Sequence, residues 1–283
     1  MKKKVRKAVI PAAGLGTRLL PLTKSIPKEL LPVGRYPMIH WCVAEAAASG
    51  IEEVILVIRQ GKEGIRAYFL EDGPGGASEP PGLAEVRRLR EMLRFTFVFQ
   101  EHPRGPGDAI LRAAGAIAGE PFALMYPDDV FPDAPPALGQ MMSLFEETGG
   151  MVTGLIRVRE GEGRRFGNCG RVELDHLEGS VYRVKKLCDK GKGSFQAAQG
   201  EELRWTGRHL LLPSFLESLE AMDTGSGELD DVSVFQRLIR EQGMRGMSLE
   251  GTVFDVGNME GYCAAQVHLA GRKGQVYLTG VDS

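Results

Sequence analysis

The chain has 283 residues, an ordinary hydrophobic fraction of 43%, an ordinary charged fraction of 25% and a formal net charge of −2 at pH 7. This length allows one large domain or two modest ones. The near-zero net charge excludes a whole-molecule field that would attract nucleic acid.

Membrane insertion and secretion are also not expected. No apolar run is long enough to cross a bilayer. The basic residues 2–7 are followed by an apolar stretch that is too short for a signal peptide and is broken by proline and glycine. The four cysteines, Cys42, Cys169, Cys188 and Cys263, are scattered without metal-ligand spacing. Reduced thiols in a cytoplasmic protein are therefore expected.

The first apolar run, Ala8–Ile10, predicts a buried strand that ends in a glycine turn at Gly14 and Gly16. Glycines allow the backbone to bend sharply and to approach a ligand closely. Backbone N–H groups in such a turn can bind phosphates, and the basic residues Arg18, Lys24 and Lys28 follow within a short distance. This segment predicts a nucleoside triphosphate site; an ordinary strand-to-helix turn with solvated basic side chains is the alternative.

Two common nucleotide motifs are excluded at this turn. The dinucleotide fingerprint requires a third glycine where Leu19 stands, and the Walker loop requires a terminal Gly-Lys-Ser/Thr that is absent. A dinucleotide oxidoreductase is therefore a distant alternative.

Short apolar strands then alternate with helical patterns. This alternation predicts an α/β fold with a mostly parallel sheet covered on both faces, and ligands bind such sheets at the carboxyl ends of strands. Strands are expected at residues 8–10, 54–58, 95–99 and 122–126, and helices at 37–49, 62–70, 83–93 and 108–118.

Two aspartates follow apolar segments in positions that suit a metal. Asp128 comes after the strand that ends at Tyr126, and Asp255 precedes Gly257. Mg²⁺ prefers one or two carboxylates together with phosphate oxygens and waters. The alternative is that Asp128 and Asp129 form a turn and that Asp255 caps a helix.

The second half is richer in separate strands, which predicts an extension of the sheet. Strands are expected at residues 151–158, 171–174, 181–187, 203–212 and 244–249, and helices at 232–242 and 259–270.

Together these segments resemble the signature of bacterial UTP–glucose-1-phosphate uridylyltransferases and, more broadly, of the sugar-phosphate nucleotidylyltransferases. The Thr23-Lys24 and Pro27-Lys28-Glu29 pieces are typical of the uridylyl branch. The resemblance is strongest over residues 5–60 and continues in the family's order along almost the whole chain. The matching segments are 13–18, 21, 23–24, 27–32, 100–114, 126–129, 166–167, 207–208, 227–229 and 254–258.

The resemblance implies a single Rossmann-like nucleotidyltransferase domain, 1–283, with a nucleotide part at about 1–150 and a sugar part at about 151–283. It implies transfer of a uridylyl group from UTP to glucose 1-phosphate with Mg²⁺ as cofactor, in a homodimer or homotetramer that binds neither nucleic acid nor membrane.

The resemblance also assigns roles to individual residues. Arg18 is expected at the pyrophosphate, Lys28 at the α-phosphate and Lys186 at the sugar phosphate, with Asp128 and Asp255 as Mg²⁺ ligands. Gln100 is expected to contact the pyrimidine edge, and Ala13 and Gly14 the same base through their backbone. The remaining nucleotide-binding candidates are Leu15, Gly16, Thr17, Lys24, Glu29 and Gly107, and the remaining sugar-binding candidates are Gly167, Lys185 and Gly207.

The sugar half departs from the family pattern. Lys185 stands where the family has a glutamate that accepts hydrogen bonds from sugar hydroxyls, and a lysine cannot accept them. Asp108 stands where the family has a histidine, and the family's Gly-Glu-Leu-Gln-Leu-Thr-Asp reads Gly-Glu-Leu-Asp-Asp-Val-Ser at 227–233. The same chemistry on another sugar phosphate or with dTTP, and a non-catalytic homologue that binds a nucleotide sugar, therefore stay open as alternatives.

Overall fold

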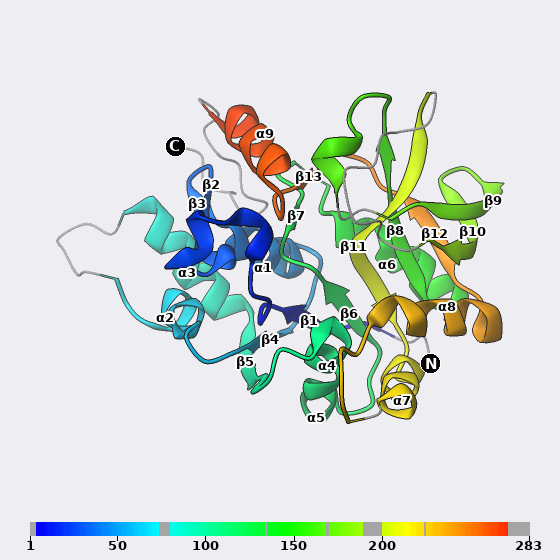
Figure 1. Ribbon diagram of the computed structural model, residues 1–283, viewed down its shortest axis with the longest axis horizontal. Coiled ribbons are helices and arrows are strands. Elements are labelled where there is room, and N and C mark those ends of the chain that lie inside the picture. Colours follow the sequence, from blue (N-terminus) through cyan, green and yellow to red (C-terminus); the bar gives the residue numbers. More distant parts are fainter. Residues whose placement is uncertain are drawn as a thin grey trace.

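Nine strands form one sheet with helices on both faces in the computed structural model, which describes residues 4–73, 80–133, 135–167, 170–188, 200–223 and 225–270 (Figure 1). The strand order is β5-β4-β1-β6-β11-β8-β12-β10-β9. These strands are β1 (Lys7–Pro11), β4 (Glu53–Ile58), β5 (Arg94–Phe99), β6 (Phe122–Met125), β8 (Val152–Val158), β9 (Val172–Glu178), β10 (Val181–Leu187), β11 (Glu202–Leu211) and β12 (Arg245–Ser248).

The α/β fold expected from the sequence is confirmed, and the sheet is mixed. Strands β5, β4, β1 and β6 are parallel to one another. Among the described strands beyond β6, the β8–β12 pair is parallel and the other neighbours are antiparallel, including the β9–β10 hairpin. The parallel part contains the segments predicted to bind nucleotide, and the mixed part is the predicted extension.

Side chains of the central strands alternate between two cores. In β1, Ala8 and Ile10 pack on one face and Val9 packs on the other, and all six residues of β4 are buried. One face is covered by α1 (Met38–Ala48), α2 (Glu63–Leu70), α3 (Pro81–Met92) and α6 (Ala137–Thr148). The opposite face is covered by α4 (Gly105–Arg112), α5 (Ala114–Ile117), α7 (Ser214–Met222) and α8 (Asp231–Gln242).

The helices differ from the sequence prediction in three places. The helix predicted at 108–118 is divided at Ala113 into α4 and α5. Helices α6 and α7 were not predicted, although their buried residues recur at helical spacing, as Leu138, Met141 and Phe145 do in α6. Both lie against the sheet, so tertiary packing stabilises them.

Short elements complete the edge of the cavity described below. Strand β7 (Asp129–Val130) pairs antiparallel with β13 (Phe254–Asp255), which places Asp255 opposite Asp129 and Phe254 opposite Val130. The hairpin β2 (Pro32–Val33) and β3 (Tyr36–Pro37) leads into α1, and β13 leads into α9 (Met259–Leu269). Single 3₁₀ turns lie at Thr17–Leu19, Leu22–Lys24, Lys28–Leu30 and Gly163–Phe166.

A buried ion pair between Arg208 and Glu45 joins helix α1 to strand β11 and to the loop after β6. The Arg208 guanidinium on β11 donates Nε to Oε1 and a terminal nitrogen to Oε2 of Glu45 on α1, each at 2.9 Å. Both side chains are almost fully buried, at 0% and 1% exposed. Arg208 also donates to the carbonyls of Tyr126 (2.8 Å) and Asp129 (2.7 Å), and Glu45 accepts the backbone N–H of Leu138 at 2.9 Å. One guanidinium therefore joins α1, β11 and the loop after β6.

Replacing Glu45 with alanine should destabilise the protein strongly. The substitution leaves the Arg208 charge buried without its carboxylate, and breaking a buried pair in this way costs about 3–5 kcal/mol. Urea unfolding followed by circular dichroism measures the loss. Glu241→Ala is the control, because its pair with Arg237 is about half exposed on both sides and should contribute less than about 1 kcal/mol. Equal losses in the two variants would contradict the prediction.

Candidate active site

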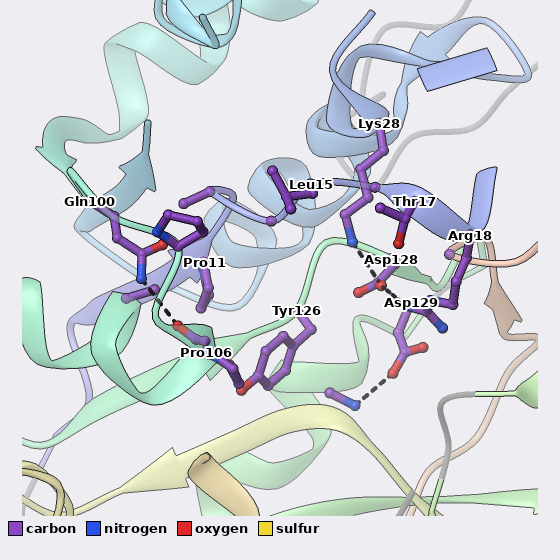
Figure 2. Close-up of a pocket in the computed structure, with 18 of the residues that line it drawn as sticks. Pro11, Leu15, Thr17, Arg18, Lys28, Gln100, Pro106, Tyr126, Asp128 and Asp129 are labelled. Carbon is purple, nitrogen blue, oxygen red and sulfur yellow. Dashed lines mark hydrogen bonds and ion pairs between the residues drawn. The ribbon is translucent and has the colours of Figure 1, made fainter. Parts of the chain in front are cut away.

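A cavity of about 470 Å³ opens at the carboxyl ends of β1 and β6 (Figure 2). The strand order reverses at this point, because β4 and β5 extend from one side of β1 and β6 lies on the other; such reversals are where α/β sheets bind ligands. The cavity is lined by Pro11, Ala13, Gly14, Leu15, Gly16, Thr17, Arg18, Lys28, Gln100, Pro103, Gly105, Pro106, Ala109, Tyr126, Asp128, Asp129, Trp205, Thr206, Gly207, Glu228 and Gly257.

The glycine turn after β1 forms one wall of the cavity. Gly16 has φ +71°, in the left-handed region that favours glycine, and its carbonyl accepts the Thr23 hydroxyl at 2.8 Å. A Cβ on Gly14 would have no protein atom within 4 Å, so the backbone there is open to a ligand. The structure therefore brings residues 13–18, all predicted from the sequence, to the cavity.

Two cations converge on one carboxylate in this cavity. Lys28 Nζ lies 3.0 Å from Asp128 Oδ2, and an Arg18 terminal nitrogen lies 3.6 Å from the same oxygen (Figure 2). Burial raises the pKa of Asp128, but the Lys28 and Arg18 charges outweigh it and hold the pKa well below its usual range. Burial likewise lowers the pKa of Lys28, but Asp128 and Glu29 outweigh it and the pKa is raised. Both groups are therefore charged at neutral pH.

Asp129 has a different environment from its neighbour. Its carboxylate accepts the Thr206 hydroxyl and, at 2.6 Å, the Gly207 backbone N–H. Burial raises the pKa of Asp129, and the Asp128 charge raises it further. A Cβ on Gly207 would lie 2.6 Å from Tyr126 Cβ, so glycine is required for this close approach. Asp129 holds β11 against the loop after β6, consistent with Asp128 being the better metal candidate.

Asp255 is brought to Asp128 through the backbone. It lies opposite Asp129 in the β7–β13 pair, and the next residue, Val256, donates its N–H to the Asp128 carbonyl at 2.8 Å. The Asp255 side chain is fully buried and accepts the Gly257 N–H at 3.1 Å. The alternative that Asp255 caps a helix is wrong: Asn258 caps α9, accepting the Gly261 N–H.

The residue types around Asp128 and Asp255 suit Mg²⁺. Asp128 borders the cavity and is held ionised, and Asp255 belongs to the strand paired with the next residue. Two carboxylates are enough, because Mg²⁺ takes its other ligands from phosphates and waters. Among the described residues, no cluster of three or more His, Cys, Asp or Glu side chains is placed to hold a metal by itself.

Several predicted nucleotide-binding residues lie outside the cavity lining. Glu29 is fully buried and pairs with Lys62 at 2.7 Å, and Lys62 also donates to the Ala12 carbonyl at 2.7 Å. This pair supports the glycine turn from below. Lys24 is exposed on its 3₁₀ turn. Gly107 packs against the 229 segment, where a Cβ would lie 2.7 Å from the Leu229 carbonyl oxygen.

Gln100 closes the opposite end of the cavity. It follows β5, is 4% exposed, and donates its amide to Asp108 at 2.7 Å and to the Gly105 carbonyl at 3.1 Å. Gln100 therefore lines the cavity with its amide fixed, an orientation that could not be seen from the sequence; base contact by Gln100 stays a prediction.

Only one of the four predicted sugar-binding residues lines the cavity. Gly207 lines the cavity, whereas Gly167, Lys185 and Lys186 do not. Lys185 and Lys186 lie on β10, three strands beyond β11, the strand next to β6. Their side chains are 54% and 58% exposed and face Asp175 and Glu173 on β9, at 3.2 and 3.8 Å.

The structure adds lining residues that sequence reasoning missed. Tyr126 directly follows β6 and donates its hydroxyl to Asp231 on α8, and Trp205 and Thr206 come from β11. The sequence signal for Tyr126 was its place at a strand end, two residues before Asp128. Glu228 reaches the cavity because the 227–229 segment packs on Gly105.

Two general expectations concern thiols and membranes. Cys42, Cys188 and Cys263 are free, and Cys169 lies outside the described residues. Among the helices described, none is both long enough and apolar enough to cross a bilayer.

Comparison with known proteins confirms the resemblance. The sequence model of the nucleotidyl transferase family matches residues 7–272. A UTP–glucose-1-phosphate uridylyltransferase of Staphylococcus epidermidis is 34% identical over 95% of this chain and 93% of its own length. The uridylyltransferase YngB of Bacillus subtilis is 33% identical over 95% of this chain and 91% of its own.

Solved structures agree. A UDP-glucose pyrophosphorylase complexed with UDP-glucose superposes with a TM-score of 0.81 at 29% identity, covering 94% of this chain and 98% of its own. A UTP-bound UGPase from Acinetobacter baumannii gives 0.77 at 26% identity, covering 95% of both chains.

The Asp128 environment predicts a specific dependence of stability on pH. Because its folded-state pKa is lowered, its contribution is fully present above the unfolded-state pKa of about 3.9 and is lost as the pH falls from there toward the lowered value. The unfolding free energy of the wild type should therefore fall more steeply below about pH 4 than that of Asp128→Asn. Urea unfolding between pH 2 and 6 tests this, and parallel curves would rule it out.

Proposed function

This chain belongs to the nucleotidyl transferase family, and we propose that it transfers a uridylyl group from UTP to glucose 1-phosphate, giving UDP-glucose and pyrophosphate. The observation that carries the proposal is the convergence of the glycine turn, Lys28, Arg18 and Asp128 on one cavity. It is supported by 34% identity over 95% of the chain to a protein named for this reaction.

The barrier to this reaction is largely electrostatic, and the cations of this cavity are placed to lower it. A phosphate oxygen of the sugar attacks the α-phosphorus of UTP; the new O–P bond forms as the bond to the β-phosphate oxygen breaks, and pyrophosphate leaves. Two anions must meet and negative charge builds on the leaving group. Cations fixed in advance at the phosphates lower this barrier.

Lys28 and Arg18 are assigned to the phosphates. Lys28 is 14% exposed, points into the cavity and is held there by Asp128, which makes it suited to the α-phosphate. Arg18 is half exposed at the cavity edge, and its planar guanidinium suits the departing pyrophosphate. The open backbone at Gly14 offers N–H groups to the same ligand.

Asp128 and Asp255 are assigned to Mg²⁺. When bound, the metal supplies positive charge that neutralises phosphate oxygens. The residues' own contribution is separate: Asp128 holds Lys28 and Arg18 in place, and the β7–β13 pairing holds Asp255 beside it.

The base is assigned to the far end, at Gln100 and the backbone of Ala13 and Gly14. The sugar is assigned to the side of Gly207, on β11. Sugar-phosphate binding by Lys185 and Lys186 stays a prediction, as do the dimer or tetramer, the division near residue 150 and the cytoplasmic location.

Lys28→Ala should lower turnover on the order of a hundred- to a thousand-fold, because one pre-positioned charge at a reacting phosphate contributes that much. Pyrophosphate release from UTP and glucose 1-phosphate measures it. Lys4→Ala, which removes an equally charged but 64% exposed side chain, should leave turnover unchanged. A variant that retained turnover and lost only nucleotide affinity would instead place Lys28 in a binding module.

Removal of divalent metal with EDTA should abolish pyrophosphate release, and added Mg²⁺ should restore it. Asp128→Asn should require a higher Mg²⁺ concentration for half-maximal rate, since one carboxylate ligand is lost. The matched variant Asp72→Asn, at a 91% exposed side chain, should show the wild-type requirement. Full turnover in EDTA would refute the metal assignment.

A further inference from the structure

The Gln100 amide has only one chemically possible orientation. It lies between the Asp108 carboxylate oxygen Oδ2, at 2.7 Å, and the Gly105 carbonyl oxygen, at 3.1 Å. Both neighbours accept hydrogen bonds and neither donates one. The amide nitrogen must therefore face them, with each of its two hydrogens directed to one oxygen.

The amide oxygen consequently faces the other way. Figure 2 shows the Gln100 nitrogen on the side of its dashed hydrogen bond and the oxygen on the opposite side, next to the cavity. Within the described ranges, the Gln100 side chain makes hydrogen bonds only through its amide nitrogen. The cavity therefore presents a fixed acceptor at this end.

Asp108 is itself locked in place. It is 1% exposed, and its second oxygen Oδ1 accepts from Arg112 at 3.1 Å and from Arg104 at 3.4 Å. Arg104 is held in turn by Asp223 on the turn after α7. One carboxylate oxygen is thus occupied by arginines while the other is directed at the Gln100 amide.

We propose that Asp108 is a positioning residue that sets the base specificity of this site through Gln100. A fixed acceptor suits a base that donates a hydrogen bond from N3, as uracil and thymine do, and repels cytosine, whose N3 is an acceptor. This inference rests on the proposed nucleotide site.

Replacing Asp108 with asparagine tests the role directly. Asparagine can accept from the arginines through its oxygen and turn its N–H₂ group to Gln100. Only the longer contact with the Gly105 carbonyl then still favours the original orientation, so the turned amide, which presents a donor to the cavity, becomes populated. The ratio of CTP to UTP dissociation constants, measured by calorimetry, should fall about tenfold, the contribution of one hydrogen bond. The ratio for dTTP and UTP should stay unchanged, because both bases carry N3–H.

Two further variants separate positioning from structural support. Arg237→Gln removes the half-exposed arginine of another helical ion pair, with Glu241 on α8, and leaves Asp108 and Gln100 untouched, so it should keep the wild-type CTP-to-UTP ratio. In a Gln100→Ala background, Asp108→Asn should change that ratio no further. Equal weakening of UTP and CTP in Asp108→Asn, with the ratio preserved, would show that Asp108 is only structural and would overturn the proposal.

The wild type alone also tests the inference if Asp108→Asn does not fold. It should bind N3-methyluridine triphosphate much more weakly than UTP, and wild-type binding of CTP as tight as that of UTP would overturn the proposal. Because these measurements need no turnover, they are independent of the transferase assay. Base selection without UDP-glucose formation would count against the proposed reaction and leave the role of Asp108 standing.

Discussion

The geometry of the site depends on the buried pair between Arg208 and Glu45. Arg208 holds the carbonyls of Tyr126 and Asp129, which bracket Asp128, and Glu45 holds the first turn of α6 while lying on α1. Helix α1 follows the glycine turn and the Lys28 segment in the chain. The Arg208–Glu45 pair thus joins the segment that carries Asp128 to the helix that follows the Lys28 segment. Asp128 is the carboxylate that Lys28 and Arg18 both approach. A flexible contact at that place would leave the separation of Lys28 and Asp128 undetermined.

The charges around the cavity are arranged in pairs with different tasks. Lys62 and Glu29 neutralise each other beneath the glycine turn and fix its carbonyl at Ala12. Lys28 and Asp128 form a pair that faces the cavity, where a phosphate can share the lysine. At the far end, Asp108 and its arginines hold Gln100 without facing the ligand themselves. Sequence neighbours therefore differ in environment: Lys28 lines the cavity whereas Glu29 is fully buried, and Asp128 faces the two cations whereas the Asp129 carboxylate is bonded to β11.

Many of the residues predicted to bind nucleotide line the cavity, because each follows a strand or a turn that has a local sequence signature. Residues 13–18, Lys28, Gln100 and Asp128 all follow strands or turns with recognisable local patterns, and the structure brings them to one cavity. Glu29 and Gly107 have equally good local patterns, but they face the core and a neighbouring segment. Burial direction within a 3₁₀ turn or a helix start depends on what packs beside it, so no local pattern could separate these residues from their neighbours.

The sequence by itself determined the fold class, the family and the position of the glycine turn, because strand–helix alternation and glycine placement act within a few residues. Tertiary structure alone decided which charges meet. The pairing of β7 with β13 joins residues 129 and 255, Arg208 reaches Glu45 across 163 positions, and the Gln100 amide is oriented by Asp108 and Gly105. The first two contacts join segments that are distant in sequence, and the third fixes a side-chain rotamer. Both outcomes depend on which groups are buried against each other, and the spacing of residues along the chain does not specify that.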